Sequence, residues 1–260
     1  MKIIDKFYNI NNKLNKNIVL ISDLHYQDKK DIKTLNNILD SIKKLKPDYI
    51  CIPGDITDKA LIKDEEEFIV WLKKLSKVSK VIISLGNHDF YINKYRRLYG
   101  QNKELLKKIS NIKNLYLLDN KNVIIDNINF MGLTIPMEYY KETYKSNDFY
   151  RCLDKININK KCYNILLCHS PLNICNKEIL KNRNIDLILC GHMHGGIVPK
   201  CMRKIFKQRG LISPNKRLFP KNVYGNLKIG NTNIIISSGI KVIPFRIINI
   251  FSPEIVNIKI

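Results

Sequence analysis

Short apolar runs recur along the chain, and each one ends in polar residues that include Asp, Asn or His. The first set of runs lies at residues 18–21, 49–52, 81–84, 165–168 and 187–190. Runs of four or five apolar residues bounded by Gly, Pro and Asp are typical of buried strands. Further strands are predicted at residues 123–125, 128–133, 224–229, 233–237 and 255–260. Asp126 with Asn127, and Gly230 with Asn231, predict tight turns that close two hairpins.

Helical periodicity appears between the early runs. Residues 31–45 and 65–75 carry apolar side chains at intervals of three and four, which predicts two amphipathic helices. Strands that alternate with helices predict a parallel α/β core. The sequence has no internal repeat and no low-complexity linker, so we expect one domain over residues 1–260. Residues 135–161 lack clear periodicity, and we expect them to form a functional loop or lid.

The composition is ordinary for a soluble globular protein except for its charge. Hydrophobic residues make up 45% of the chain and charged residues 26%, but the formal net charge is +22. Such a charge attracts polyanions, which suggests nucleic acid or a membrane surface as a partner. The alternative is a compositional bias, because Lys, Asn and Ile are abundant throughout and Lys far outnumbers Arg, the usual residue for specific phosphate recognition.

The cysteines and the N-terminal segment bear on location. The seven Cys are irregularly spaced and form no C-x-x-C pair, which predicts reduced thiols rather than a disulfide framework. The N-terminal segment lacks the apolar core of a secretory signal, and no run approaches the ~18 apolar residues of a membrane span. We therefore expect a cytoplasmic protein, with peripheral contact at the inner face of the membrane as a further expectation.

That further expectation comes from the segment that runs from Lys200 to Lys221. Eight basic residues lie in it, interleaved with Met, Ile, Leu and Phe. This mixture suits contact with an anionic membrane surface. The alternative is a surface loop whose charges are solvated and whose apolar residues pack on the core.

All five histidines follow predicted strands. They are His25, His88, His169, His192 and His194. Ligands in open α/β sheets bind outside the carboxyl ends of the strands, so one edge should gather every His. Asp23 and His25, like His192 and His194, are two residues apart, and an extended chain would point each pair the same way. One such His could be a structural hydrogen bonder, but the set together with nearby Asp residues predicts a metal site.

The motifs D-x-H, G-D, G-N-H-D, a lone His after a strand and G-H-x-H occur in this order between Asp23 and His194. The pattern resembles the calcineurin-like metallophosphoesterase superfamily. The sequence GHMHGG and the following GLISPNKRLFPKNVYG resemble a branch of bacterial phosphodiesterases often attached to or near the membrane. The resemblance implies an α/β fold in which two β-sheets are sandwiched between helices, in four α-β-β-α layers.

The resemblance also implies a role for each residue of these motifs. It assigns one divalent ion to Asp23, His25 and His194, and a second ion to Asn87, His169 and His192. Asp55 would bridge both ions. His88 would be a catalytic residue that faces the substrate, and Asp89 would orient His88. This ligand set mixes nitrogen and oxygen atoms and has no Cys, which suits Mn, Fe or Zn.

The implied function is a dinuclear-metal phosphoesterase. Two divalent ions would hold a water between them and lower its pKa, so that a metal-bridging hydroxide attacks the phosphate ester. His88 would donate a proton or a strong hydrogen bond to the leaving oxygen. The bacterial branch favours a phosphodiester as the substrate.

Two other functions stay open. The charge of +22 suggests a nuclease. However, an enzyme that binds duplexes normally needs an added capping domain, and 260 residues leave little room for one, so we expect no specific nucleic-acid partner. The second is an inert metal-binding interaction scaffold, against which the complete ligand set argues. A Ser-based hydrolase is disfavoured because the sequence has no G-x-S-x-G elbow.

Overall fold

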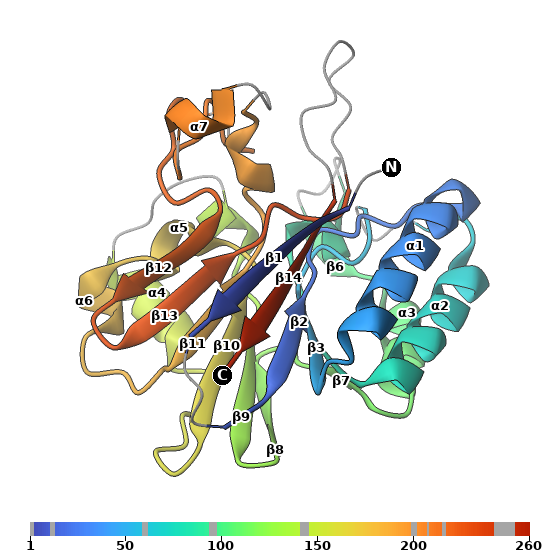
Figure 1. Ribbon diagram of the computed structural model, residues 1–260, viewed down its shortest axis with the longest axis horizontal. Coiled ribbons are helices and arrows are strands. Elements are labelled where there is room, and N and C mark those ends of the chain that lie inside the picture. Colours follow the sequence, from blue (N-terminus) through green and yellow to red (C-terminus); the bar gives the residue numbers. More distant parts are fainter. Residues whose placement is uncertain are drawn as a thin grey trace.

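Two six-stranded sheets lie face to face at the centre of the protein, as Figure 1 shows for the computed structural model. The structure describes residues 3–10, 14–58, 62–93, 98–140, 146–198, 202–206, 208–214, 217–241 and 253–260. The order across the first sheet is β1 (Ile4–Asn9), β14 (Glu254–Lys259), β2 (Asn17–Leu20), β3 (Tyr49–Pro53), β4 (Lys80–Ser84) and β7 (Leu115–Leu117). Strands β2, β3, β4 and β7 are parallel, so their carboxyl ends lie at one edge.

The second sheet has the same size and also contains a parallel centre. Its order is β12 (Gly225–Ile229), β13 (Thr232–Ile236), β11 (Leu187–Cys190), β10 (Tyr163–Cys168), β9 (Ile128–Leu133) and β8 (Lys121–Ile125). Strands β9, β10, β11 and β13 are parallel, while β8 and β12 are antiparallel edges. A separate hairpin joins β5 (Phe90–Asn93) to β6 (Leu98–Gln101).

Helices cover the outer face of each sheet. On one side lie α1 (Lys29–Leu45), α2 (Glu65–Val78) and α3 (Lys103–Ser110). On the other side lie α4 (Ser146–Leu153), α5 (Pro171–Ile174) and α6 (Lys177–Leu180), and α7 (Arg203–Phe206) stands apart from them (Figure 1). The Asp28 side chain caps α1 by accepting a hydrogen bond from the Lys30 N–H, and three Glu residues occupy the first turn of α2, where the helix dipole favours negative charge.

The protein thus has four layers, namely helices, sheet, sheet and helices, and three apolar clusters lie between them. One lies between α1–α3 and the first sheet, one between α4–α6 and the second sheet, and one between the two sheets. In β3 every residue is buried, because its alternate side chains fill the first and the third of these clusters. A strand buried on both faces reads as a continuous apolar run rather than as an alternation. The four-layer α/β fold is therefore confirmed.

The strands and hairpins predicted from the sequence are present within one or two residues of their expected bounds. Asp126 and Asn127 both have positive φ, as a two-residue hairpin turn requires. The expectation of an irregular segment at residues 135–161 is wrong in part, because α4 and a short 3₁₀ helix, η2 (Met137–Tyr140), lie in it. Cys51, Cys168 and Cys190 are free thiols buried within strands. None of the helices in the described ranges has the length and apolar character needed to cross a bilayer.

Candidate metal centre

Five loops bring the candidate ligands to one end of the molecule. In the first sheet, the loop after β2 carries Asp23 and His25, and the loops after β3 and β4 carry Asp55 and the short helix η1 (Asn87–Asp89). In the second sheet, the loop after β10 carries His169, and the loop after β11 carries His192 and a second short helix, η3 (His194–Gly196). Because the strands before these loops are parallel within each sheet, their carboxyl ends converge on the seam between the two sheets.

The backbone of these loops is strained where the ligands lie. The φ angles are 55° for Asp23, 45° for His25, 52° for Asp55, 68° for His192 and 45° for His194. An extended conformation of the two i, i+2 pairs is therefore wrong, although each pair does point toward one centre. Left-handed backbone costs about 1–3 kcal/mol at a residue other than Gly, and it persists where surrounding structure enforces it, often at functional sites.

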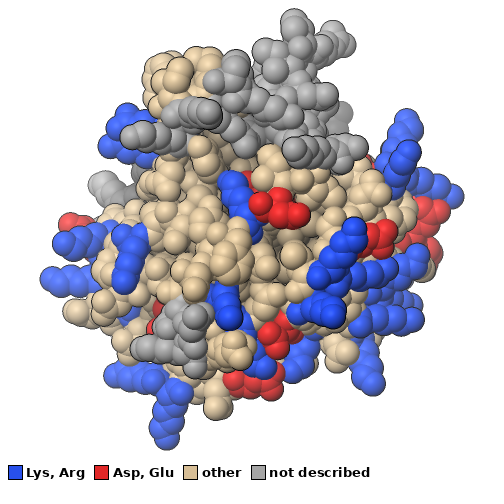
Figure 2. Space-filling view, viewed as in Figure 1, with Lys and Arg blue, Asp and Glu red and all other residues tan. Residues whose placement is uncertain are grey.

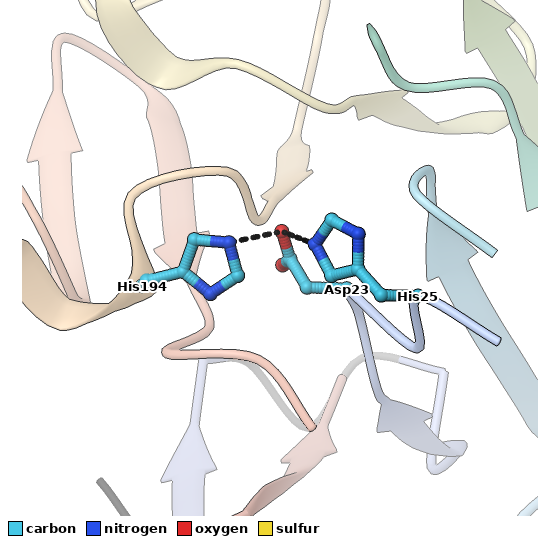
Figure 3. A group of neighbouring side chains, drawn as sticks. All are labelled: Asp23, His25 and His194. Atoms are coloured by element: carbon cyan, nitrogen blue, oxygen red, sulfur yellow. Dashed lines mark ion pairs between the residues drawn. The ribbon is translucent and has the colours of Figure 1, made fainter. Parts of the chain in front are cut away.

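The side chains form three overlapping groups. Ligand atoms lie within 4.8 Å of one another in each of the sets Asp23–His25–His194, His25–Asp55–His88 and Asp55–His169–His192. The first set equals the ligands expected for one ion, and the third contains most of those expected for the other. Figure 3 shows the first set, in which an Asp23 oxygen lies between the rings of His25 and His194, at 3.8 Å and 3.6 Å from their Nε2 atoms.

Bonds between the loops fix this arrangement. His192 donates its backbone N–H to Asp23 Oδ1 at 3.1 Å, and His88 donates its backbone N–H to Asp55 Oδ1 at 2.7 Å. The Ser22 hydroxyl donates to Asp23 Oδ2 at 2.6 Å, and His169 Nδ1 contacts the Pro53 carbonyl at 2.7 Å. The side chains of Asp23, Asp55 and His169 are therefore each oriented by a backbone atom from another segment, as metal ligands often are.

Two glycines of the sequence motifs lie so close to the Asp carboxylates that no side chain fits at their positions. A Cβ on Gly86, in G-N-H-D, would collide with the Asp55 carboxylate, and a Cβ on Gly191, in G-H-x-H, would collide with that of Asp23. Any larger residue would push the carboxylate out of position.

Several buried ligand atoms in the described residues lack a hydrogen-bond partner. They are Nε2 of His25 and His192, Nδ1 of His194 and Oδ1 of Asn87. Leaving a polar atom buried and unpaired costs about 1–3 kcal/mol, so a cluster of such atoms calls for a bound group. All four atoms can bind a metal ion through a lone pair, so these residues fit a dinuclear divalent metal centre.

Burial and opposite charges set the protonation of this cluster. Burial lowers the pKa of His25 to about 4 and that of His192 to about 3, so both rings are neutral and keep a lone pair for a cation. Burial also opposes charge on Asp55 and His169, but their mutual attraction outweighs it. The Asp55 pKa is consequently lowered, and that of His169 is raised to about 9. Asp55 Oδ2 lies 2.9 Å from His169 Nε2.

Asp89 does not make the contact expected with His88, whose ring instead contacts Asp58. The His88 Nδ1 atom contacts Asp58 Oδ1 at 2.7 Å, and Gln27 donates a hydrogen bond to the other Asp58 oxygen. Burial lowers the pKa of His88. The hydrogen bond to Asp58 and the charges of Asp55 and Asp58 raise this pKa by a larger amount, so the net shift is upward. The sequence carried a signal for Asp58, since it follows Asp55 by three residues in the same loop.

Asp89 instead organises the backbone below the site. Its two oxygens accept hydrogen bonds from the N–H groups of Asp55, Thr57 and Gly86 at 2.9, 2.9 and 2.8 Å, and one from the Thr57 hydroxyl. Burial and the charge of Asp55 raise the pKa of Asp89 to about 7. Its position is explained by these bonds, which join the loop after β3 to the loop after β4.

Comparison with known proteins agrees with this geometry. The family model for calcineurin-like phosphoesterases matches residues 16–196. The chain is 27% identical over 197 residues to the uncharacterized metallophosphoesterase Cj0846 of Campylobacter jejuni, a match that covers 75% of the chain and 48% of that protein. It therefore spans about half the length of this relative. Identity to the phosphodiesterase YaeI of Escherichia coli is 23% over 181 residues, covering 69% of the chain and 60% of YaeI.

Among solved structures, a dimetal phosphatase from Danio rerio matches with a TM-score of 0.44 and 11% identity, covering 87% of the chain and 88% of the phosphatase. The family match extends through every ligand motif, from the strand before Asp23 to the glycine after His194. The chain belongs to the calcineurin-like phosphoesterase family.

Proposed function

We propose that the protein is a hydrolase that uses two divalent ions to cleave a phosphate ester. The observation that carries this proposal is the cluster of buried, unpaired ligand atoms on both sides of Asp55. Asp23, His25 and His194 would hold one ion, Asn87, His169 and His192 the other, and Asp55 both. Such ions, when bound, supply positive charge and an activated water for attack at phosphorus.

His88 is the residue placed to assist the leaving group. Its side chain is 35% exposed, whereas the other four histidines of the cluster are buried. Asp58 occupies Nδ1, which leaves Nε2 for the substrate. The raised pKa keeps the ring protonated at higher pH, so it can donate to the oxygen on which negative charge develops. Asp58 acts through His88 and is a positioning residue.

The substrate we propose is a phosphodiester. Support comes from the similarity to a relative named a phosphodiesterase. The test compares bis(p-nitrophenyl) phosphate with p-nitrophenyl phosphate in the presence of Mn²⁺. We expect the larger kcat/KM for the diester, and a strong preference for the monoester would contradict the proposal.

We also propose that the protein docks on an anionic membrane through the segment from Lys200 to Lys221. Four large apolar side chains in the described part of this segment are exposed: Ile205 by 76%, Leu218 by 69%, Phe219 by 59% and Ile212 by 37%. The basic side chains Arg209, Arg217 and Lys221 are exposed with them. Exposed apolar residues set among cations suit an anionic lipid surface. Lys200, Cys201, Lys207, Asn215 and Lys216 lie outside the described residues.

This segment is attached directly beside the candidate metal centre. The Gly196 carbonyl, two residues after His194, accepts a hydrogen bond from the Leu211 N–H at 2.8 Å. Gly196 and Gly210 pack so closely that a Cβ on either would collide with the other's backbone. A membrane bound by this surface would lie next to the site, which supports a lipid-borne phosphoester as the substrate.

A nucleic-acid partner has less support. Lys and Arg side chains are dispersed over the face seen in Figure 2, with acidic side chains among them, rather than gathered into one track. A protein that follows a phosphate backbone usually concentrates its cations along the path of the strand.

Co-sedimentation with vesicles tests the docking. Binding to anionic vesicles at low salt, weakened by Arg209→Glu with Lys221→Glu and by Leu218→Ser with Phe219→Ser, would support it. Ile124→Ser is the matched control, because this exposed residue lies on β8 outside the segment. No binding at low salt, or equal loss in the control, would refute it.

A further inference from the structure

Tyr140 is a buried tyrosine beside the candidate metal centre that none of the proposed roles uses. Its ring centroid lies 5.1 Å from that of His192 and 6.0 Å from that of His169. The residue is 5% exposed, and its hydroxyl is fully buried without a hydrogen-bond partner among the described residues. A buried hydroxyl without a partner costs free energy, so a group bound in the site would stabilise this one by accepting its proton.

The second sheet positions Tyr140 next to the histidines of the candidate metal centre. Tyr140 ends η2, which follows β9, and β9 lies beside β10 in the second sheet. Three neighbouring strands, β9, β10 and β11, thus deliver Tyr140, His169 and His192 to the same end. The Asn173 side chain of α5 donates to the Tyr139 carbonyl at 3.3 Å and ties η2 to the element that follows His169.

The chemistry of the surroundings indicates what the hydroxyl binds. A tyrosine phenol ordinarily titrates at about pH 10, far above neutrality. The phenol therefore stays protonated and acts as a hydrogen-bond donor. Among the described residues, none of the site carboxylates Asp23, Asp55 and Asp89 accepts its proton, and an oxygen of a molecule bound in the site is a chemically matched acceptor.

We propose that Tyr140 is a substrate-binding residue whose hydroxyl donates a hydrogen bond to a phosphoryl oxygen of the bound ester and of the phosphate product. The proposal rests on the proposed function, because it assigns a contact within the same site. A neutral hydroxyl suits this position. It can donate to an anionic phosphoryl oxygen, and unlike a cationic side chain it does not compete with the divalent ions for the carboxylate ligands.

Inorganic phosphate is the probe, and Tyr140→Phe removes the hydroxyl while keeping the ring. In the Mn²⁺-loaded variant we expect phosphate to bind about 10- to 100-fold more weakly, by calorimetry and by inhibition, since a hydrogen bond to a charged group is lost. Metal content should be unchanged. The melting temperature of the metal-free variant should not fall, because the hydroxyl pairs with no group in the part of the chain that the structure describes. The matched control is Tyr139→Phe, whose ring packs on Phe149, and it should bind phosphate as the wild type does.

The outcomes separate this inference from the proposed function. Unchanged phosphate affinity in Tyr140→Phe, with a wild type that binds Mn²⁺ and phosphate, would overturn this inference alone. Loss of metal from the variant would also overturn it, because the hydroxyl would then support the ligands. A wild type that binds no divalent ion would refute the proposed function, and this inference with it.

Discussion

The two sheets contribute different chemistry to the same site. The loops of the first sheet supply every carboxylate and the amide of the cluster, through Asp23, Asp55 and Asn87, together with Asp58 and Asp89 in support. The ligands expected from the loops of the second sheet are all histidines. The oxygen ligands of the first sheet, with His25 beside them, thus face the histidines of the second sheet across the seam. Asp55 contacts His169 at 2.9 Å, and Asp23 accepts a hydrogen bond from the His192 backbone at 3.1 Å.

This division means that the site exists only when the two sheets are packed together. The apolar layer between the sheets brings Asp55 within 2.9 Å of His169, although 114 residues separate them in the sequence. A bound cation would join the two sheets in turn, so metal binding should stabilise the fold as well as support catalysis. The first prediction tests the residue at the centre of this link.

Asp55→Ala should have the largest effect. Asp55 belongs to two of the three ligand groups, so its loss should release both ions and abolish nearly all activity. Metal analysis and kcat/KM measure the two effects. Asp126→Ala is the matched control, because Asp126 binds Tyr49 and Lys80 at a hairpin far from the cluster, and it should keep metal and activity. Retention of both ions by Asp55→Ala would contradict the proposal that Asp55 joins the two halves of the metal centre.

His88→Ala should have the next largest effect and should separate catalysis from metal binding. We expect unchanged metal content and a kcat lower by roughly 100- to 10,000-fold, the usual contribution of a general acid. The loss should be smaller for substrates with good leaving groups, which need no proton. Equal losses for good and poor leaving groups, or a loss of metal, would argue against this role.

Asp58→Asn should have the smallest effect and should appear as a shift in pH dependence. The hydrogen bond and charge of Asp58 raise the pKa of His88, so their removal lowers that pKa. Activity that requires protonated His88 should then decline at lower pH in the variant, with a fall in kcat of about 10-fold at neutral pH. The exposed control Asp40→Asn should leave the pH profile unchanged. An unchanged alkaline limb in Asp58→Asn would show that Asp58 does not tune His88.

Much of the fold could be predicted because its strands are buried on both faces. The apolar runs of β3, β10 and β11 have no helical alternative at their length, and the Asp126 turn fixes the register of β8 against β9. In contrast, β1 is an edge strand with alternating half-buried and exposed residues, and its polar sequence gave no apolar run to detect. The short helix α4 was missed for a related reason, since its eight residues span barely two turns.

The candidate ligands could be predicted as a set, but their surroundings could not. Residue type and position after a strand are visible in a sequence, which is why the histidines could be grouped. The partner of His88 depends on how the loops after β3 and β4 turn, and left-handed backbone at residues such as Asp23 and Asp55 leaves no local pattern. The contact expected from Asp89 is consequently made by Asp58, while Asp89 binds backbone N–H groups.

The most direct test of the account is to titrate the metal-free protein with Mn²⁺ while following ion binding, melting temperature and hydrolysis of bis(p-nitrophenyl) phosphate. We expect two bound ions per chain, a higher melting temperature on binding, and activity that appears only when both positions are filled. Full activity in the metal-free protein would contradict it.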